Sequence, residues 1–179
     1  FRVSMIQGNI TPDRKWDPDL FAPTLELYRG LTRENWDSRL VIWPETAVPA
    51  FAHQVESRLL APLEAEARAE GTDLLIGIPV SDGEGGRYFN ALMTLGGERA
   101  TYFKRHLVPF GEFVPFRGLL QPLGEALDIP MSDFSSGDGE RPLVPLAGYQ
   151  AGVSICYEDA FGEETIEALP EAAFLVNAT

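Results

Sequence analysis

Three side chains with complementary chemistry each stand directly after a segment that is typical of a β-strand: Glu45, Lys104 and Cys156. Each segment is short, apolar and rich in β-branched or aromatic residues, and each ends where a Pro- or Gly-containing loop or a helix follows. In open α/β sheets, functional sites form at strand ends, where loops converge. We therefore expect these three side chains to share one pocket.

The three residue types suit acyl transfer through a thiol. A thiol attacks an acyl carbon well only as the thiolate. Glu45 can accept the thiol proton as a general base. The ammonium group of Lys104 favours the thiolate and can donate to the oxyanion of a tetrahedral intermediate. The backbone N–H of Tyr157, directly after the candidate nucleophile, is a possible second oxyanion donor.

Each of the three residues also has a structural interpretation. A single cysteine at a strand end is more often a small buried hydrophobic residue than a nucleophile. Glu45 can simply cap the segment that follows Pro44. Lys104 can be a solvated hairpin lysine, since lysines are mostly exposed. The residue types alone leave these alternatives open, and the local sequence around each residue must decide.

The elements that must position these side chains follow from hydrophobic periodicity and turn residues. Strands are expected over 3–7, 40–43, 73–80, 87–95, 98–103, 143–146, 150–155 and 173–177. Helices are expected from Asp17-Pro18 onward and over 53–70, 117–127 and 163–169, and hairpin turns at Gly96-Gly97 and Ala147-Gly148. This alternation of strands and helices, with inserted hairpins, predicts one layered α/β domain with a mixed sheet.

The composition is that of one globular domain. Of 179 residues, 45% are hydrophobic and 23% are charged. The net charge of -13 disfavours nucleic-acid binding, because such a surface repels phosphate backbones. Cys156 is the single cysteine, so an internal disulfide is excluded, and with only His53 and His106 no metal site is expected. No cofactor is expected either, and no apolar stretch reaches the ~20 residues that span a bilayer.

Three blocks of the sequence resemble the Glu, Lys and Cys blocks of the nitrilase (carbon–nitrogen hydrolase) superfamily, and they occur in the same order. The blocks are Trp43-Pro44-Glu45-Thr46-Ala47, the run 102–112 (YFKRHLVPFGE) and Ile155-Cys156-Tyr157-Glu158-Asp159. Within the superfamily, the run 104–116 and the opening Gln7-Gly8-Asn9-Ile10 with Lys15-Trp16 are similar to apolipoprotein N-acyltransferases. Soluble amidases usually share the Glu and Lys blocks but lack the full Pro-Phe-Gly-Glu loop. The similarity extends over almost the whole chain.

The resemblance implies a nitrilase-like α-β-β-α sandwich with mixed sheets, carried on a membrane-embedded helical domain of the bacterial inner membrane and facing the periplasm. Cys156 would take an acyl chain from a phospholipid as a thioester. It would then pass this chain to the α-amino group of the diacylglyceryl-cysteine of an apolipoprotein. Glu45 would be the general base for the thiol and then for the amine, and Lys104 would stabilise the oxyanion.

Four further residues match functional positions of the family. Glu112 matches a carboxylate near the catalytic lysine, which it can orient through a charge-assisted hydrogen bond, or it is a solvated loop residue. Tyr157 and Glu158 match residues that follow the nucleophile, and Glu158 can also cap the helix that begins nearby. Trp16 matches a functional aromatic residue, or it packs in the core.

Two features beside Lys104 invite other interpretations. His106 is close enough in sequence to be a base, but we interpret it as structural because Glu45 already fills that role. The apolar residues of 110–116 are dense for a loop. In a soluble protein they would be buried, and the alternative hypothesis is that they line the entry of an acyl chain or contact lipid.

Two features depart from the family. No membrane span is present, and the chain stops at Asn177-Ala178-Thr179, where the family continues into an Asn-Asp-x-Trp-Phe segment. We therefore expect residues 1–179 to be one nitrilase-like catalytic domain, truncated at its C-terminal end, with the flanking membrane helices absent. Two alternatives stay open: a soluble nitrilase-type amidase with water as the acceptor, and a non-catalytic module that keeps the fold.

Overall fold

The computed structural model describes residues 1–83, 86–109, 111–113, 134–138 and 142–179. Its strands are β1 (Val3–Met5), β2 (Leu40–Ile42), β3 (Asp73–Ser81), β4 (Tyr88–Leu95), β5 (Thr101–Phe103), β6 (Leu143–Leu146), β7 (Tyr149–Ile155) and β8 (Phe174–Ala178). Its helices are α1 (Pro12–Lys15), α2 (Pro18–Arg33), α3 (Ala52–Val55), the π-helix η1 (Glu56–Leu60), α4 (Ala61–Glu70), the 3₁₀-helix η3 (Cys156–Ala160), α6 (Gly162–Thr165) and the 3₁₀-helix η4 (Ile166–Ala168). The expected helix over 117–127 and most of the apolar run 110–116 lie outside the described residues.

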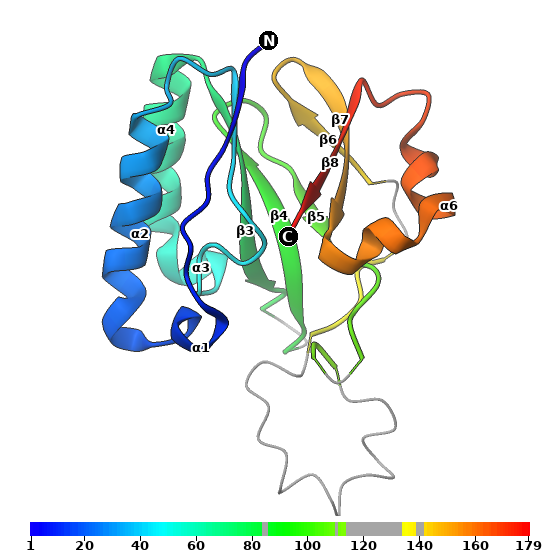
Figure 1. Ribbon diagram of the computed structural model, residues 1–179, viewed down its shortest axis with the longest axis horizontal. Helices are drawn as coiled ribbons and strands as arrows, with labels where there is room; N and C mark the ends of the chain where they lie inside the picture. The colour runs from blue at the N-terminus through cyan, green and yellow to red at the C-terminus, as the bar shows by residue number, and fades with distance from the viewer. Residues whose placement is uncertain (84–85, 110, 114–133, 139–141) are drawn as a thin grey trace, which may run out of the picture.

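Two mixed sheets lie face to face, with helices on both outer faces (Figure 1). The first sheet has the order β1-β2-β3-β4-β5; β1, β2 and β3 are parallel, and β4 and β5 are added antiparallel. The second sheet has the order β6-β7-β8, with β6 antiparallel and β8 parallel to β7. The predicted α-β-β-α sandwich with mixed sheets is confirmed.

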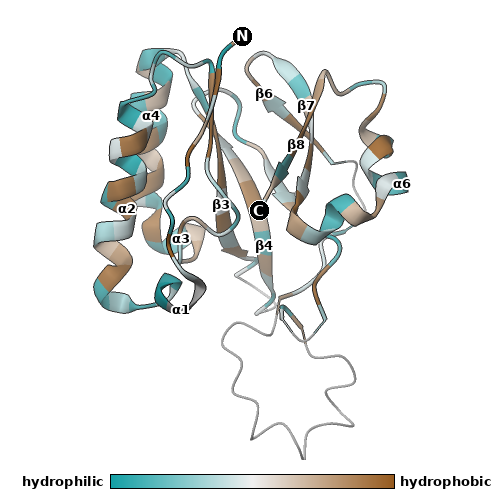
Figure 2. Cartoon of the chain, in the orientation of Figure 1, coloured by the Kyte–Doolittle hydropathy of each residue, from teal (hydrophilic) through white to brown (hydrophobic). Residues whose placement is uncertain are grey.

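One hydrophobic core lies between the first sheet and the helices α2, α3 and α4. Asp17 starts α2 by accepting the Asp19 N–H at 2.9 Å, and Pro18 occupies the first turn, where its missing N–H is harmless. Trp43 is fully buried, and its Nε1 donates to Thr32 at 2.9 Å. Along α2, apolar and polar residues alternate in bands, as expected for a helix with one buried face (Figure 2).

A second core fills the space between the two sheets. Its buried members are Leu40, Leu75, Leu92, Tyr102, Val144, Leu146, Ala147, Ala151, Val153, Ile155 and Ala178. A polar contact supplements this packing at one end, where the Asp73 carboxylate accepts the Ala147 N–H at 2.7 Å. The relative position of the two sheets is therefore set mainly by apolar side chains from both.

Two expected helices differ from the structure. The expected helix over 53–70 starts one residue earlier and contains the π-helix η1, in which the Ala61 N–H donates to the Glu56 carbonyl. The next residue, Pro62, has no N–H and its ring crowds the preceding turn, so the regular α-helical bonding is interrupted there. The expected helix over 163–169 is two short segments, α6 and η4.

The expected strand over 98–103 is also shorter and begins only at Thr101. The Thr94 hydroxyl accepts the Ala100 N–H at 2.7 Å and donates to the Glu98 carbonyl at 2.8 Å. These local bonds hold the start of the segment as a turn instead of a strand.

The loop that carries Glu45 lies directly on β3 at Gly77. The Val48 N–H donates to the Gly77 carbonyl at 3.2 Å. A Cβ added at Gly77 would lie 2.2 Å from the Pro44 carbonyl oxygen and 2.5 Å from the Thr46 nitrogen. Only glycine permits this approach, so Gly77 sets the height of the Glu45 loop above the sheet.

We predict that Gly77→Ala destabilises the fold by about 1–3 kcal/mol, because the added methyl group must displace backbone. The matched control is Gly30→Ala in α2, where an added Cβ meets nothing within 4 Å. That change should keep or raise the stability by up to ~1 kcal/mol, since alanine favours a helix. Urea unfolding followed by tryptophan fluorescence measures both effects, and equal stability of the two variants would contradict the prediction.

Candidate active site

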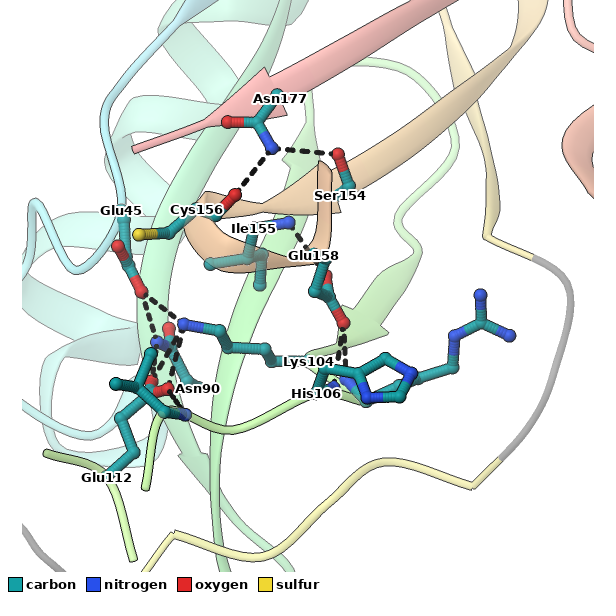
Figure 3. A network of polar contacts seen from close by, with 12 residues as sticks. Glu45, Asn90, Lys104, His106, Glu112, Ser154, Ile155, Cys156, Glu158 and Asn177 are labelled. Atoms are coloured by element: carbon teal, nitrogen blue, oxygen red, sulfur yellow. Dashed lines mark hydrogen bonds and ion pairs between the residues drawn. The ribbon is translucent and has the colours of Figure 1, made fainter. Parts of the chain in front are cut away.

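Lys104 is the buried centre of the site, with 1% of its side chain exposed. Its Nζ donates to Glu45 Oε1 at 3.0 Å and to Glu112 Oε1 at 3.0 Å (Figure 3). Burial by itself lowers the pKa of an ammonium group, but the charges and hydrogen bonds of the two carboxylates outweigh it, so the pKa of Lys104 is raised. Lys104 is therefore a cation at neutral pH, and the solvated alternative is wrong.

Glu112 and Asn90 complete this cluster. The second oxygen of Glu112 accepts the Val108 N–H at 2.9 Å, so the carboxylate also holds its own loop. The side-chain amide of Asn90 donates to Glu45 Oε1 at 2.7 Å and to Glu112 Oε1 at 2.8 Å. Glu112 therefore contacts Lys104 directly. This contact is the charge-assisted hydrogen bond that the sequence suggested.

Cys156 is the first residue of η3, at the turn directly after β7. Its φ of 50° lies in the left-handed region, which non-glycine residues rarely adopt. Asn177 holds this turn by donating to the Cys156 carbonyl and to Ser154 Oγ, both at 3.0 Å. The thiol is half-buried and points toward the carboxylate of Glu45 (Figure 3). The Cys156 thiol is therefore not enclosed in the hydrophobic core.

Glu158 joins the turn at Cys156 to the segment that follows Lys104. It is buried, with 4% exposed. Its carboxylate accepts four hydrogen bonds, from the Tyr102 hydroxyl at 3.0 Å and from the backbone N–H groups of Arg105 at 2.6 Å, His106 at 3.2 Å and Ile155 at 2.7 Å. Burial and the Glu158 charge raise the pKa of Tyr102, which keeps its hydroxyl as a donor. The bond from Ile155 is the capping role expected of Glu158.

The structure separates the other two predicted residues from this cluster. Tyr157 is 45% exposed, but its backbone N–H lies in the first turn of η3, beyond reach of the helix's own carbonyls. Trp16 is 37% exposed, so it is not a core residue, and it lines a groove of about 620 Å³ beside α2 and α3. No polar contact found among the described residues joins either side chain to Glu45 or Lys104.

His106 belongs to a neighbouring cluster. Its Nε2 lies 2.5 Å from Glu164, and its ring stacks on Phe161 with centroids 3.8 Å apart. Arg105 pairs with the same Glu164 at 3.1 Å. In Figure 3 the His106 ring points away from the Lys104 ammonium. This placement agrees with the structural interpretation of His106.

Sequence reasoning missed three residues of the site: Asn90, Asn177 and, as a contact of Glu45, Lys15. The Lys15 Nζ donates to the Glu45 carbonyl at 2.9 Å. Burial lowers the pKa of Lys15, and the attraction of Glu45 only partly offsets this. A signal was available, because Lys15 and Lys104 are the only lysines of the chain. Asn90 is also one of the few polar residues in a largely apolar strand.

The arrangement has the groups that acyl transfer requires. The Cys156 thiol points toward the Glu45 carboxylate, and the buried Lys104 ammonium is bound to that carboxylate. The Tyr157 N–H lies in the first turn of the helix that follows the thiol. Among the residues that the structure describes, no group of three His, Cys, Asp or Glu side chains could hold a metal ion. None of the helices within the described ranges is both long and apolar enough to cross a bilayer.

The fold and the order of these groups define a class of protein. The chain belongs to the carbon–nitrogen hydrolase family, whose sequence model matches residues 2–179. Among solved structures, it is similar to a carbon–nitrogen hydrolase from Helicobacter pylori G27, with a TM-score of 0.65, 16% identity, and coverage of 98% of this chain and 58% of that one. An amidase from Nesterenkonia sp. has a TM-score of 0.64 at 18% identity, covering 99% and 64%. At these identities the structures support the fold alone.

The more similar sequences are apolipoprotein N-acyltransferases. The protein of that name from Methylococcus capsulatus is 53% identical over 178 residues, which are 99% of this chain and 35% of the relative. The one from Nitrosomonas europaea is 42% identical, covering 99% of this chain and 36% of the relative. The chain therefore spans about a third of the length of these relatives.

We predict that the two lysines titrate on opposite sides of the ordinary lysine value of 10.5. Lys15 should lose its proton below this pH and Lys104 above it. A lysine with a raised folded-state pKa stabilises the fold below its unfolded value and loses this effect as pH rises through the folded one. The ¹³Cε chemical shifts of isotope-labelled lysine, assigned by comparison with the Lys15→Arg variant, measure both pKa values. Titration of the two lysines at the same pH would contradict the prediction.

We predict that Glu158→Gln destabilises the fold by about 2–4 kcal/mol. A side-chain amide has one acceptor oxygen, so it cannot replace both carboxylate oxygens, and buried N–H groups are left without an acceptor. The control is Glu163→Gln, an exposed residue of α6, which should change stability by less than ~0.5 kcal/mol. Thermal unfolding compares the two. A Glu158→Gln variant as stable as its control would show that the four bonds contribute little.

Proposed function

We propose that this chain is the catalytic domain of an apolipoprotein N-acyltransferase and that Glu45, Lys104 and Cys156 are its catalytic residues. The observation that carries the proposal is the direction of the Cys156 thiol, toward a carboxylate that is itself bound to a buried ammonium ion. The choice of substrates rests on the relatives, which carry the acyltransferase name at 53% and 42% identity. The same relatives favour this function over that of a soluble amidase.

The first half-reaction forms a thioester. Glu45 takes the thiol proton, and Cys156 Sγ attacks the carbonyl carbon of a phospholipid ester. The Lys104 ammonium and the Tyr157 N–H donate to the oxyanion that this attack creates. The intermediate then collapses, the ester C–O bond breaks, and the leaving lysophospholipid oxygen takes the proton from Glu45. The products are acyl-Cys156 and a lysophospholipid.

The second half-reaction uses the same groups. The α-amino group of a diacylglyceryl-cysteine attacks the thioester carbonyl and gives a proton to Glu45. The oxyanion is held as before, and the C–S bond breaks to release the thiolate of Cys156. The thiolate recovers the proton from Glu45, so the enzyme returns to its starting state. No cofactor or metal takes part in either half-reaction.

The supporting residues act through these three. Glu112 holds the Lys104 ammonium in place, and Glu158 fixes the Cys156 turn against the segment after Lys104. Trp16 lies at the groove beside Lys15, where an aromatic side chain can contact a lipid substrate. We infer that the domain faces the periplasm at the bacterial inner membrane and that membrane attachment comes from parts of the protein beyond residues 1–179.

We predict that phospholipid alone acylates Cys156 when the full-length protein is incubated with it in detergent micelles. Peptide mass spectrometry should find a hydroxylamine-labile acyl group on Cys156, and Cys156→Ala should carry none at this position. The thioester accumulates because no amine acceptor is present to receive the chain. Addition of a diacylglyceryl-cysteine peptide should then remove the acyl group and yield the N-acylated peptide.

The donor distinguishes the competing functions. A small aliphatic amide such as butyramide, supplied in place of phospholipid, should leave Cys156 unmodified. Acylation by the amide but not by phospholipid would support a soluble amidase. A Cys156 that no donor acylates would indicate a non-catalytic module.

A further inference from the structure

Asn90 is a polar residue in the most buried part of the first sheet. It lies in β4, pairs with Pro79 of β3, and is only 3% exposed. Its neighbours along the strand, Phe89 and Ala91, are buried as well. A buried amide is costly unless its polar atoms are hydrogen-bonded, so its presence here requires an explanation.

The Asn90 amide is only half satisfied. Its Nδ2 donates to Glu45 Oε1 at 2.7 Å and to Glu112 Oε1 at 2.8 Å, which uses both N–H bonds. Its Oδ1 is buried and has no hydrogen-bond partner among the described residues. The opposite amide orientation would place this oxygen against two carboxylates, so electrostatics fix the orientation despite the unpaired carbonyl.

The backbone of Asn90 is part of the same arrangement. Its carbonyl accepts the Lys104 N–H at 2.8 Å. One residue therefore fixes the main chain of the lysine and one oxygen of each carboxylate that binds the lysine. An ammonium group is a compact charge whose three donors rotate freely, so Lys104 alone does not select which oxygen of Glu45 it holds.

We propose that Asn90 is a positioning residue that locks the carboxylate of Glu45 by its Oε1, so that the other oxygen is presented to the thiol of Cys156. This role in acyl transfer rests on the proposed function of the chain. Figure 3 shows the required geometry: the bonded oxygen of Glu45 is directed at Asn90 and Lys104, and the other is directed at the sulfur. The unpaired Oδ1 is the cost of this orientation.

The test measures thiol activation without any lipid. Full-length protein is treated with iodoacetamide, and the alkylation rate of Cys156 is followed by peptide mass spectrometry. Asn90→Leu keeps the size of the side chain but removes both donors, and we expect the rate to fall about 10²-fold, as for a misplaced catalytic group. Asn90→Asp has the same shape with acceptors in place of donors, and its rate should fall at least as far.

The matched control is Thr94→Val on the same strand. Thr94 is 1% exposed and hydrogen-bonded, but its partners are Glu98 and Ala100, away from the thiol. Thr94→Val should lower the melting temperature and leave the alkylation rate within about twofold of wild type. A purely structural Asn90 would behave as Thr94 does, so a similar alkylation rate for the Asn90 variants and wild type overturns the proposal.

A second measurement separates this inference from the proposed function. In phospholipid turnover, Asn90→Leu should lower kcat about 10²-fold and change KM less than twofold, because the substrate still binds while the base is misdirected. A wild-type protein that does not react with phospholipid refutes the acyltransferase function, yet the alkylation rates still decide the role of Asn90. Unchanged kcat in a folded Asn90→Leu variant would refute that role.

Discussion

A buried ammonium ion shared by two carboxylates is the interaction on which the rest of the site depends. Removing a lysine from water is costly, and the cost is offset only when the surrounding charges and hydrogen bonds are well placed. Glu45 arrives from the loop after β2, Lys104 from the end of β5 and Glu112 from the following loop, so three separate segments must meet at one point. Loss of either carboxylate would leave a charge only partly compensated, so the positions of Glu45 and Glu112 are tied to the buried ammonium ion.

Backbone strain lies at or beside both Glu45 and Cys156. Thr46, directly after Glu45, has a φ of 47°, and Cys156 has a φ of 50°. Such conformations cost roughly 1–3 kcal/mol each, and for a β-branched residue they are true outliers. The close approach at Gly77 holds the first, while Asn177 and Glu158 hold the second. Both strained residues lie where the chain leaves a strand, and the Cys156 thiol points toward the Glu45 carboxylate (Figure 3).

Much of the fold could be predicted from the sequence, because strands that are buried on both faces are apolar throughout and their turns carry glycine. The layered architecture and the hairpin at Gly96-Gly97 followed from such local signals. The π-helix η1 could not be predicted in this way. It results from a proline inside a helical pattern, and the effect of such a proline depends on packing. Glu45, Lys104 and Cys156 became candidates because they follow strand ends, and the sequence blocks around them favoured these three residues. Asn90 could not, because its partners are 45 and 22 residues away in the sequence and only the pairing of β3, β4 and β5 brings them together.

The hydrophobic core between the two sheets also affects the geometry of the candidate active site. The thiol belongs to the second sheet, whereas the carboxylate and the ammonium belong to the first, so their separation depends on how the sheets pack. Leu92 and Ile155 lie in that shared core, and Glu158 spans it with bonds to both sides. Protein interiors are close-packed and respond to the loss of a single methylene group by partial collapse. A change in this core would therefore alter the approach of sulfur to carboxylate, even though no reacting atom is touched. In this fold the apolar packing between the sheets therefore also constrains the distance between the Cys156 thiol and the Glu45 carboxylate.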